Sequence, residues 1–268
     1  MQLAVVSYGG KTFRLSGRVD DAITAHHISR GQFYELETLV FLAELLRRSQ
    51  SSDFTIIDAG ANIGNHSVFL ASQFSNSRVL SFEMNPEAFS YLRANIEINN
   101  LKNVTPVNCG LSSKSGRCGI KSRVKDPLGG ALLDFSQGDI VELTTLDEYF
   151  LEHHGAPKVA LLKIDVEGHE IPCLSGAKLV LAEHRPLIFL ECKEVPQFHD
   201  LVSYLEPLGY EIVMAAEGNL PNFLFAHSDV VGQMFTHAEL YCFRKDLCLR
   251  HVQSWQLVRQ LKYLSAQR

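Results

Sequence analysis

The chain has 268 residues, of which 46% are hydrophobic and 21% charged, and its 25 Lys and Arg against 30 Asp and Glu give a formal net charge of −5. This composition is that of a globular protein and excludes a largely disordered or fibrous chain, and the length favours one α/β domain with extensions. The acidic balance argues against a duplex nucleic-acid binder, and the apolar runs are too short to span a bilayer.

The N-terminal part predicts a hairpin followed by a helix. Residues 3–15 fit two short strands around Gly9-Gly10, which is a turn signal. Apolar side chains at helical spacing over residues 36–46 predict a helix that ends on two arginines, where cations suit the helix dipole. The first 13 residues lack the long apolar stretch of a secretory signal, so we expect a cytoplasmic protein.

From residue 54 onward, short apolar runs alternate with helical patterns. Such runs predict buried strands, and buried strands separated by helices indicate a parallel sheet covered on both faces. We expect strands at residues 54–57, 78–82, 104–108, 159–164 and 187–190, and helices at 65–74, 86–99 and around 171–183. Two further strands, at 210–215 and 222–226, are joined by a link too short for a parallel crossover and should be antiparallel.

The alternation is interrupted between residues 112 and 144, a stretch rich in glycine, lysine and arginine. This stretch predicts an inserted hairpin or a loop, which is either solvated or faces a substrate as a lid, as long loops often do. The six cysteines are spaced apart without metal-like pairs, so we expect them to be reduced thiols.

The end of the chain has its own composition. Residues 239–268 hold six Lys and Arg against two acidic residues. An apolar face recurs there at helical spacing and consists of Cys248, Val252, Trp255, Val258 and Leu261. We expect this face to pack on the body of the protein or on a second copy in a homodimer, or to dock to an anionic membrane surface or an acidic carrier. The chain thus divides into an N-terminal extension (1–52), an α/β domain (53–228) and a basic helical tail (229–268).

Residues 55–65 carry a chemical signal of their own. A buried strand runs into Gly60 and Gly64 before a helix begins, so a ligand can approach the backbone at the carboxyl end of the sheet. The spacing of these glycines differs from the pyrophosphate fingerprint. Asp58 would repel a diphosphate and welcome a cation, and Glu83, at the end of the next strand, can accept hydrogen bonds from ribose hydroxyls. A positively charged nucleoside without phosphate, such as S-adenosylmethionine, fits both. In the alternative, Asp58 only caps the following turn and Glu83 is solvated.

A second motif, Lys163-Ile-Asp165-Val-Glu167-Gly168-His169-Glu170, follows another buried strand and resembles the signature of the FkbM-type methyltransferases. Further matching pieces occur in family order across residues 32–226, among them Phe33-Tyr34-Glu35 and Phe82-Glu83-Met84-Asn85-Pro86. The resemblance implies a class I methyltransferase fold. This is an α/β Rossmann-like sheet of strand order 3-2-1-4-5-7-6, with the last strand antiparallel and helices on both faces.

The resemblance also implies an activity. Members of this family are expected to transfer a methyl group from S-adenosylmethionine to a hydroxyl, commonly of a sugar, glycan, glycolipid or polyketide-like small molecule, with S-adenosylhomocysteine as the product. We assign cofactor binding to Glu35, Asp58, Gly60, Ala61, Asn62, Gly64, Glu83, Met84, Asn108, Cys109, Gly110 and Asp165. Of these, Asn108, Cys109 and Gly110 are placed beside the adenine by strand order alone. Asp165, Glu167 and His169 fall on the acceptor side and are the candidate catalytic residues.

Three mechanisms stay open for the acceptor hydroxyl. In the first, His169 or Asp165 takes its proton as a general base. In the second, Asp165 and Glu191 hold a divalent metal such as magnesium, which binds and acidifies the hydroxyl. In the third, the carboxylates only position the acceptor. His169 could also simply cap a helix.

Rival functions are a nicotinamide-dependent oxidoreductase, which Asp58 disfavours, and a non-catalytic S-adenosylmethionine-binding module. An amino-methylating nucleic-acid enzyme is expected to show an Asn/Asp-Pro-Pro-aromatic turn after the fourth strand, where this chain has Asp165-Val166-Glu167. We therefore expect a small-molecule or glycan acceptor and no nucleic acid.

Overall fold

The computed structural model describes residues 2–48, 53–121, 132–134, 139–153, 158–192, 195–216 and 222–235. Its central feature is a seven-stranded sheet with the order β5-β4-β3-β10-β11-β13-β12. The strands are β3 (Thr55–Ala59), β4 (Arg78–Phe82), β5 (Val104–Val107), β10 (Val159–Ile164), β11 (Leu187–Glu191), β12 (Tyr210–Ala216) and β13 (Asn222–His227). Neighbouring strands are parallel, except that β13 is antiparallel to both β11 and β12. This is the order that the family resemblance implies.

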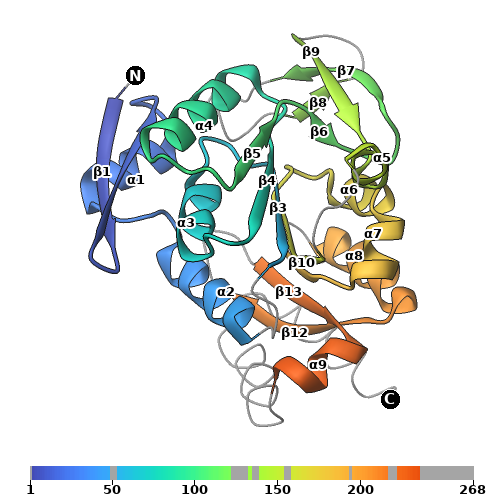
Figure 1. Cartoon of the computed structure of the whole chain (residues 1–268). Helices are drawn as coiled ribbons and strands as arrows, with labels where there is room; N and C mark the ends of the chain where they lie inside the picture. The colour runs from blue at the N-terminus through green and yellow to red at the C-terminus, as the bar shows by residue number, and fades with distance from the viewer. Residues whose placement is uncertain are drawn as a thin grey trace.

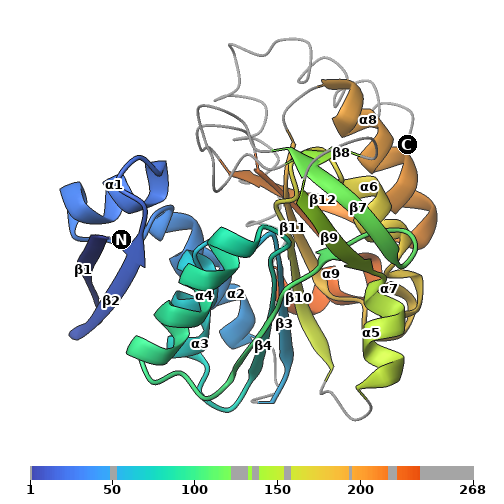
Figure 2. The same cartoon turned by 90° about the horizontal axis from the view of Figure 1, so that it is seen from above.

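Helices cover both faces of this sheet, as the alternation in the sequence predicts, and Figure 2 shows the two layers on either side of the strands. One layer consists of α2 (Leu36–Arg48), α3 (Asn65–Gln73) and α4 (Pro86–Ile98), and the other of α5 (Leu146–Glu152), α6 (Glu170–Ser175), α7 (Lys178–His184) and α8 (Val195–Leu205). Because successive strand residues point to opposite faces, Ile56 joins the core of the first layer and Ile57 that of the second. The strands read as apolar runs because both faces are buried.

The N-terminal residues form the predicted hairpin and one helix, namely β1 (Gln2–Tyr8), β2 (Lys11–Gly17) and α1 (Ala22–Arg30). The apolar pattern does not predict α1, because the buried residues of this helix are Thr24 and His27. Phe13 of β2 belongs to the same hydrophobic core as Phe69 of α3. The hairpin therefore packs on the layer that contains α3 and α4 (Figure 1).

The interrupted stretch and the two residues before it form a second, four-stranded sheet with the order β6-β9-β7-β8. Its strands are β6 (Gly110–Leu111), β7 (Gly116–Lys121), β8 (Leu132–Asp134) and β9 (Asp139–Thr144). Because β9 pairs antiparallel with β7, the predicted inserted hairpin is confirmed, and β6 and β8 extend it on either side. Residues 122–131 and 135–138 lie outside the described part of the chain, and with them the predicted lid.

The helix expected around residues 171–183 is instead two helices, α6 and α7. The break follows from contacts with α5. The carbonyl of Gly176 accepts a hydrogen bond from the N–H of Asp147 at 2.9 Å, and the Asp147 carboxylate accepts the N–H of Val180 at 3.1 Å. Gly176 also passes so close to another segment that a Cβ there would lie 2.0 Å from the carbonyl oxygen of Ser112. These long-range contacts replace the hydrogen bonds of a continuous helix.

The remaining elements follow the sheet. After α8 comes the 3₁₀ turn η1 (Glu206–Leu208), and α9 (Ser228–Met234) follows β13. The strands β12 and β13 are antiparallel to each other, as the short link between them predicts. Four cysteines, Cys109, Cys118, Cys173 and Cys192, are buried free thiols. Among the described residues, none forms a helix with the length and hydropathy that crossing a bilayer requires. Residues 236–268, which include Cys242, Cys248 and the predicted apolar face of the tail, lie outside the described part.

Candidate active site

The loop between β3 and α3 lies at the carboxyl end of the central strands. Gly60 and Gly64 have positive φ angles of +78° and +90°, which glycine adopts readily. The N–H groups of Gly60 and Ala61 donate to the Phe82 carbonyl at 2.9 and 3.0 Å, which ties the loop to the end of β4. A Cβ on Gly60 would lie 1.8 Å from the carbonyl oxygen of Asp165. The loop is therefore packed directly against the turn that follows β10.

Glu83 follows β4 and is bound to this loop. Its carboxylate oxygens accept hydrogen bonds from the backbone N–H groups of Asn62, at 2.8 Å, and Asn85, at 2.7 Å. Glu83 is only 6% exposed, so the alternative of a solvated carboxylate is wrong. Burial raises the pKa of Glu83 to about 7, against the effect of the two hydrogen bonds. The side-chain Oδ1 of Asn62 is buried and has no hydrogen-bond partner among the described residues, so a polar ligand has an atom to bind next to Glu83.

Asp58 is completely buried in β3 and already has partners. Its Oδ1 lies 3.0 Å from the Nζ of Lys163, and its Oδ2 accepts a hydrogen bond from the hydroxyl of Ser67 at 2.6 Å. Burial alone would raise the pKa of Asp58, but the Lys163 ammonium lowers it below its ordinary value, so the two side chains form an ion pair. The sequence predicts that Asp58 contacts a cationic ligand directly. That contact stays a prediction, because the charged partner that the structure shows for Asp58 is Lys163.

Glu35 comes to the same end of the sheet from the N-terminal extension. Its Oε2 lies 3.2 Å from the Nε2 of His66 in the first turn of α3. Burial alone would raise the pKa of Glu35, but the neighbouring His66 lowers it. The residue before Glu35, Tyr34, is held by the side chain of Asn65. This side chain accepts a hydrogen bond from the Tyr34 N–H at 3.0 Å and donates one to the Tyr34 carbonyl at 2.9 Å. The position that the family motif assigns to Glu35 thus lies beside the start of α3.

Three acidic side chains gather at the ends of β10 and β11. Asp165 follows β10 directly, its N–H donates to the Ala59 carbonyl at 3.0 Å, and its side chain is 42% exposed. Carboxylate oxygens of Asp165, Glu167 and Glu191 lie within 4.8 Å of one another. The structure therefore brings together the two predicted catalytic acids, Asp165 and Glu167, and places Glu191, the second metal ligand of the metal hypothesis, beside them. A divalent cation there would share Asp165 with Lys163, whose Nζ lies 3.6 Å from Asp165 Oδ2.

His169 lies on the same turn, but its ring contacts the inserted sheet. Its Nε2 lies 2.9 Å from the hydroxyl oxygen of Ser112, and burial lowers the pKa of His169. His169 occupies the N-cap position of α6, as the helix-cap alternative expects, but its side chain makes no capping hydrogen bond there. Ser112 is 57 residues away in the chain, and no spacing in the sequence connects it with His169.

Glu170 is a second residue that sequence reasoning missed. It is 2% exposed, and its Oε1 accepts the N–H of Gly168 at 2.9 Å while its Oε2 accepts a hydrogen bond from the side chain of Gln197 at 2.6 Å. Glu170 thereby connects the turn that carries the acidic residues to α8. It stands inside the recognised motif, two residues after Gly168, and its place in the motif was the available signal.

The residues predicted to surround the adenine lie together at the ends of β4 and β5. The side-chain amide of Asn108 donates to the Glu83 carbonyl at 2.8 Å. A Cβ on Gly110 would lie 3.4 Å from the sulfur of Met84, so these two residues are in contact range. Burial raises the pKa of the Cys109 thiol to about 12, which leaves Cys109 an unreactive apolar group.

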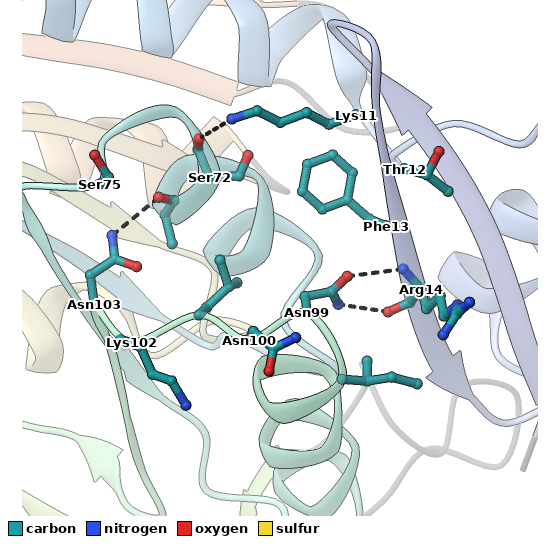
Figure 3. Close-up of a pocket in the computed structure, with 13 residues that line it drawn as sticks. Lys11, Thr12, Phe13, Arg14, Ser72, Ser75, Asn99, Asn100, Lys102 and Asn103 are labelled. Atoms are coloured by element: carbon teal, nitrogen blue, oxygen red, sulfur yellow. Dashed lines mark hydrogen bonds between the residues drawn. The ribbon is translucent and has the colours of Figure 1, made fainter.

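A separate groove of about 880 Å³ lies between β2 and the ends of α3 and α4 (Figure 3). Lys11, Arg14 and Lys102 line it together with uncharged residues. Lys11 donates to the carbonyl of Ser72 at 3.5 Å, and the amide of Asn103 donates to three further carbonyls around the end of α3. Positive charge suits the carbonyl end of a helix, so these contacts have a structural explanation.

Comparisons with known proteins agree with the motifs. The family described as "Methyltransferase FkbM domain" matches residues 58–212, more than half of the chain. "Methyltransferase sdnD" of Sordaria araneosa is 28% identical in an alignment that covers 50% of this chain and 62% of that protein. "Hexuronic acid methyltransferase AglP" of Haloferax volcanii is 31% identical over 134 residues, or 49% of this chain and 53% of that protein. The chain thus spans between half and two thirds of these relatives. The solved METTL16 methyltransferase domain is 15% identical with a TM-score of 0.50, covers 84% of this chain and 86% of its own, and shows the fold alone.

Proposed function

Because this chain belongs to the FkbM methyltransferase family, as its motifs predict, we propose that it is an S-adenosylmethionine-dependent O-methyltransferase. The acceptor is a hydroxyl of a sugar, glycan, glycolipid or polyketide-like small molecule. The observation that carries the proposal is the convergence of the Gly60–Gly64 loop, Glu83 and Asp165 at the carboxyl ends of three adjacent strands. Ligands of open α/β sheets bind at this edge.

The residues present fit the proposed cofactor. Glu83 offers a carboxylate to two ribose hydroxyls, and the unpartnered Oδ1 of Asn62 offers a further acceptor. Glu35 and Asp165 add negative charge at the same end of the sheet, which suits a cationic ligand, while the charges of Asp58 and Lys163 offset each other. When bound, S-adenosylmethionine supplies the methyl group to be transferred. The loop glycines leave the backbone open to such a ligand.

Cofactor affinity is expected to depend on pH through Glu83. The ionised carboxylate accepts both ribose hydroxyls, and at pH 6 a group of pKa about 7 is only about one tenth ionised, so affinity for S-adenosylhomocysteine should fall about tenfold between pH 8 and pH 6. Titration calorimetry at the two pH values measures this. Glu83→Gln is the control and should bind weakly at both values. A wild-type affinity equal at pH 6 and pH 8 would contradict the role of Glu83.

The same pKa affects stability with the opposite sign. The folded-state pKa of Glu83 lies above its ordinary value, so the protonated carboxyl stabilises the fold fully below about pH 4.5, and this contribution is lost as the pH rises through 7. Weak binding at pH 6 therefore cannot be ascribed to unfolding through Glu83.

We assign proton abstraction from the acceptor hydroxyl to Asp165. Its carboxylate is the partly exposed group at the end of β10, next to the glycine loop, whereas the Nε2 of His169 is engaged with Ser112. A positioned general base typically contributes 10²–10⁴ in rate. Glu167 and His169, on the same turn, then orient the acceptor. The name of the Haloferax volcanii relative favours a sugar hydroxyl among the proposed acceptors.

The proposal is tested by incubating the protein and labelled S-adenosylmethionine with hexuronic acids, nucleotide sugars, lipid-linked glycans and hydroxylated metabolites. We expect label in an O-methyl product. We also expect the rate to survive thorough removal of divalent ions with a chelator, because the Lys163 ammonium already provides positive charge beside Asp165. Loss of activity that magnesium restores would replace the general-base mechanism with a metal held by Asp165, Glu167 and Glu191. Cofactor binding without transfer to any acceptor would favour a non-catalytic binding module.

A further inference from the structure

Lys163 is a charged residue in a strand that is otherwise apolar. Its side chain is 5% exposed, and the neighbouring strand residues Leu162 and Ile164 are completely buried. It lies in register with Asp58 on β3 and with Phe189 on β11. Removing an ammonium from water costs several kcal/mol, so a side chain in this place requires compensating partners.

Three acceptors surround the Lys163 ammonium, and they belong to different segments. The Nζ lies 3.0 Å from Asp58 Oδ1, 3.4 Å from the Gly60 carbonyl oxygen and 3.6 Å from Asp165 Oδ2. The Gly60 carbonyl accepts a hydrogen bond from the ammonium, and the two carboxylates are its ion-pair partners. Burial alone would lower the pKa of Lys163, but Asp58 and Asp165 raise it above its ordinary value, so the group stays a cation.

The acceptors belong to two neighbouring strands and the segments that follow them. Asp58 lies in β3 and Gly60 directly after it, whereas Asp165 directly follows β10. Gly60 begins the predicted cofactor loop, and Asp165 begins the turn that carries the acidic residues. Their backbones touch, since a Cβ on Gly60 would meet the Asp165 carbonyl at 1.8 Å and the Asp165 N–H donates to the Ala59 carbonyl at 3.0 Å. A small displacement of either segment therefore displaces the other. The Lys163 side chain connects both segments to Asp58.

We infer that Lys163 is a positioning residue that fixes the Gly60 loop and the Asp165 carboxylate relative to each other. The inference rests on the proposed function, since it gives this geometry the task of aligning donor and acceptor. Asp58 then serves as the buried counter-charge that keeps Lys163 in place. One carboxylate oxygen of Asp165 is held by Lys163, and the partly exposed side chain is kept at the end of β10.

The test compares Asp58→Asn with the double variant Asp58→Asn/Lys163→Met. Asparagine removes the charge of Asp58 but keeps an oxygen beside Lys163, whose contacts with Gly60 and Asp165 are left in place, and the comparison is made at a temperature where urea denaturation shows both variants folded. The double variant removes both charges of the buried pair and should fold, as such replacements often do. We expect the double variant to bind S-adenosylhomocysteine at least about tenfold more weakly than Asp58→Asn in titration calorimetry, a difference of about 1.4 kcal/mol. Should it fail to fold, Asp58→Asn/Lys163→Gln, in which two amides can hydrogen-bond across the strands, provides the same comparison.

Hydrogen exchange of the ligand-free proteins supplies a second readout. The Asp165 amide, which bonds across to Ala59 of β3, should exchange at least about tenfold faster in the double variant than in Asp58→Asn. The Gly168 amide is the internal control, because Glu170 holds it without Lys163. Equal affinity and equal Asp165 exchange in the two variants would overturn the inference. A wild-type protein that does not bind S-adenosylhomocysteine would overturn the proposed function instead, and the exchange comparison would still decide the role of Lys163.

Discussion

Replacing Asp58 with alanine is expected to lower the free energy of unfolding by about 3–5 kcal/mol, the cost of leaving a buried charge without its partner. The Lys163 ammonium lies 3.0 Å from Asp58, and the two side chains are 5% and 0% exposed. Alanine also leaves the Ser67 hydroxyl without the carboxylate that accepts its hydrogen bond. Urea denaturation of the ligand-free protein measures the difference in unfolding free energy.

The control for this prediction removes both charges. Asp58→Ala/Lys163→Met should recover a large part of the lost stability, because no unpaired charge is then buried. From the sequence alone, Asp58→Ala would be expected to weaken cofactor binding in a folded chain. The burial of Asp58 adds a loss of stability, so binding must be compared at a temperature where the variant is folded. Wild-type stability of Asp58→Ala would show that the ion pair does not stabilise the fold.

Replacing Asp165 with asparagine is expected to reduce kcat by about 10²–10⁴ while S-adenosylhomocysteine still binds within about threefold of wild type. The amide keeps the size of the carboxylate and places an oxygen beside the Lys163 ammonium, 3.6 Å away, but it cannot take a proton. Steady-state rates with the acceptor found by the labelling screen measure kcat, and calorimetry measures binding.

Glu97→Gln is a matched control, because Glu97 is an exposed carboxylate on α4 away from the strand ends, and its loss should leave kcat unchanged. Wild-type turnover of Asp165→Asn would remove Asp165 from the proposed mechanism. A large loss of kcat in His169→Ala in that case would transfer the role of base to His169, the other candidate in the sequence.

The sheet could be predicted because its strands are buried on both faces and so read as apolar runs between helical patterns. The helix α1 could not, since Thr24 and His27 form its buried side and give no apolar periodicity. The break between α6 and α7 depends on Asp147 and Ser112, which are remote in the sequence. By contrast, α8 is not among the predicted helices although its sequence contains the signal. Its buried residues recur at helical spacing and are Phe198, Leu201, Val202 and Leu205.

Many residues of the candidate site could be identified from the sequence, but the side chains that they contact could not. The glycine loop, Glu83 and the acidic turn can be recognised from spacing at strand ends. That Asp58 faces Lys163 depends on the register of β3 against β10, which no local pattern specifies. The contact between Ser112 and His169 depends on how the inserted sheet packs against the turn after β10. Contacts between segments distant in the chain therefore account for what sequence reasoning missed.

A crystal structure of the protein in complex with S-adenosylhomocysteine is the most direct test of the central claim. We predict that the ribose hydroxyls donate hydrogen bonds to the carboxylate of Glu83 and that the amino-acid end of the ligand lies between the Gly60 loop and Asp165. Electron density for the ligand at any other place, or a dinucleotide bound at this edge of the sheet in its stead, would contradict it.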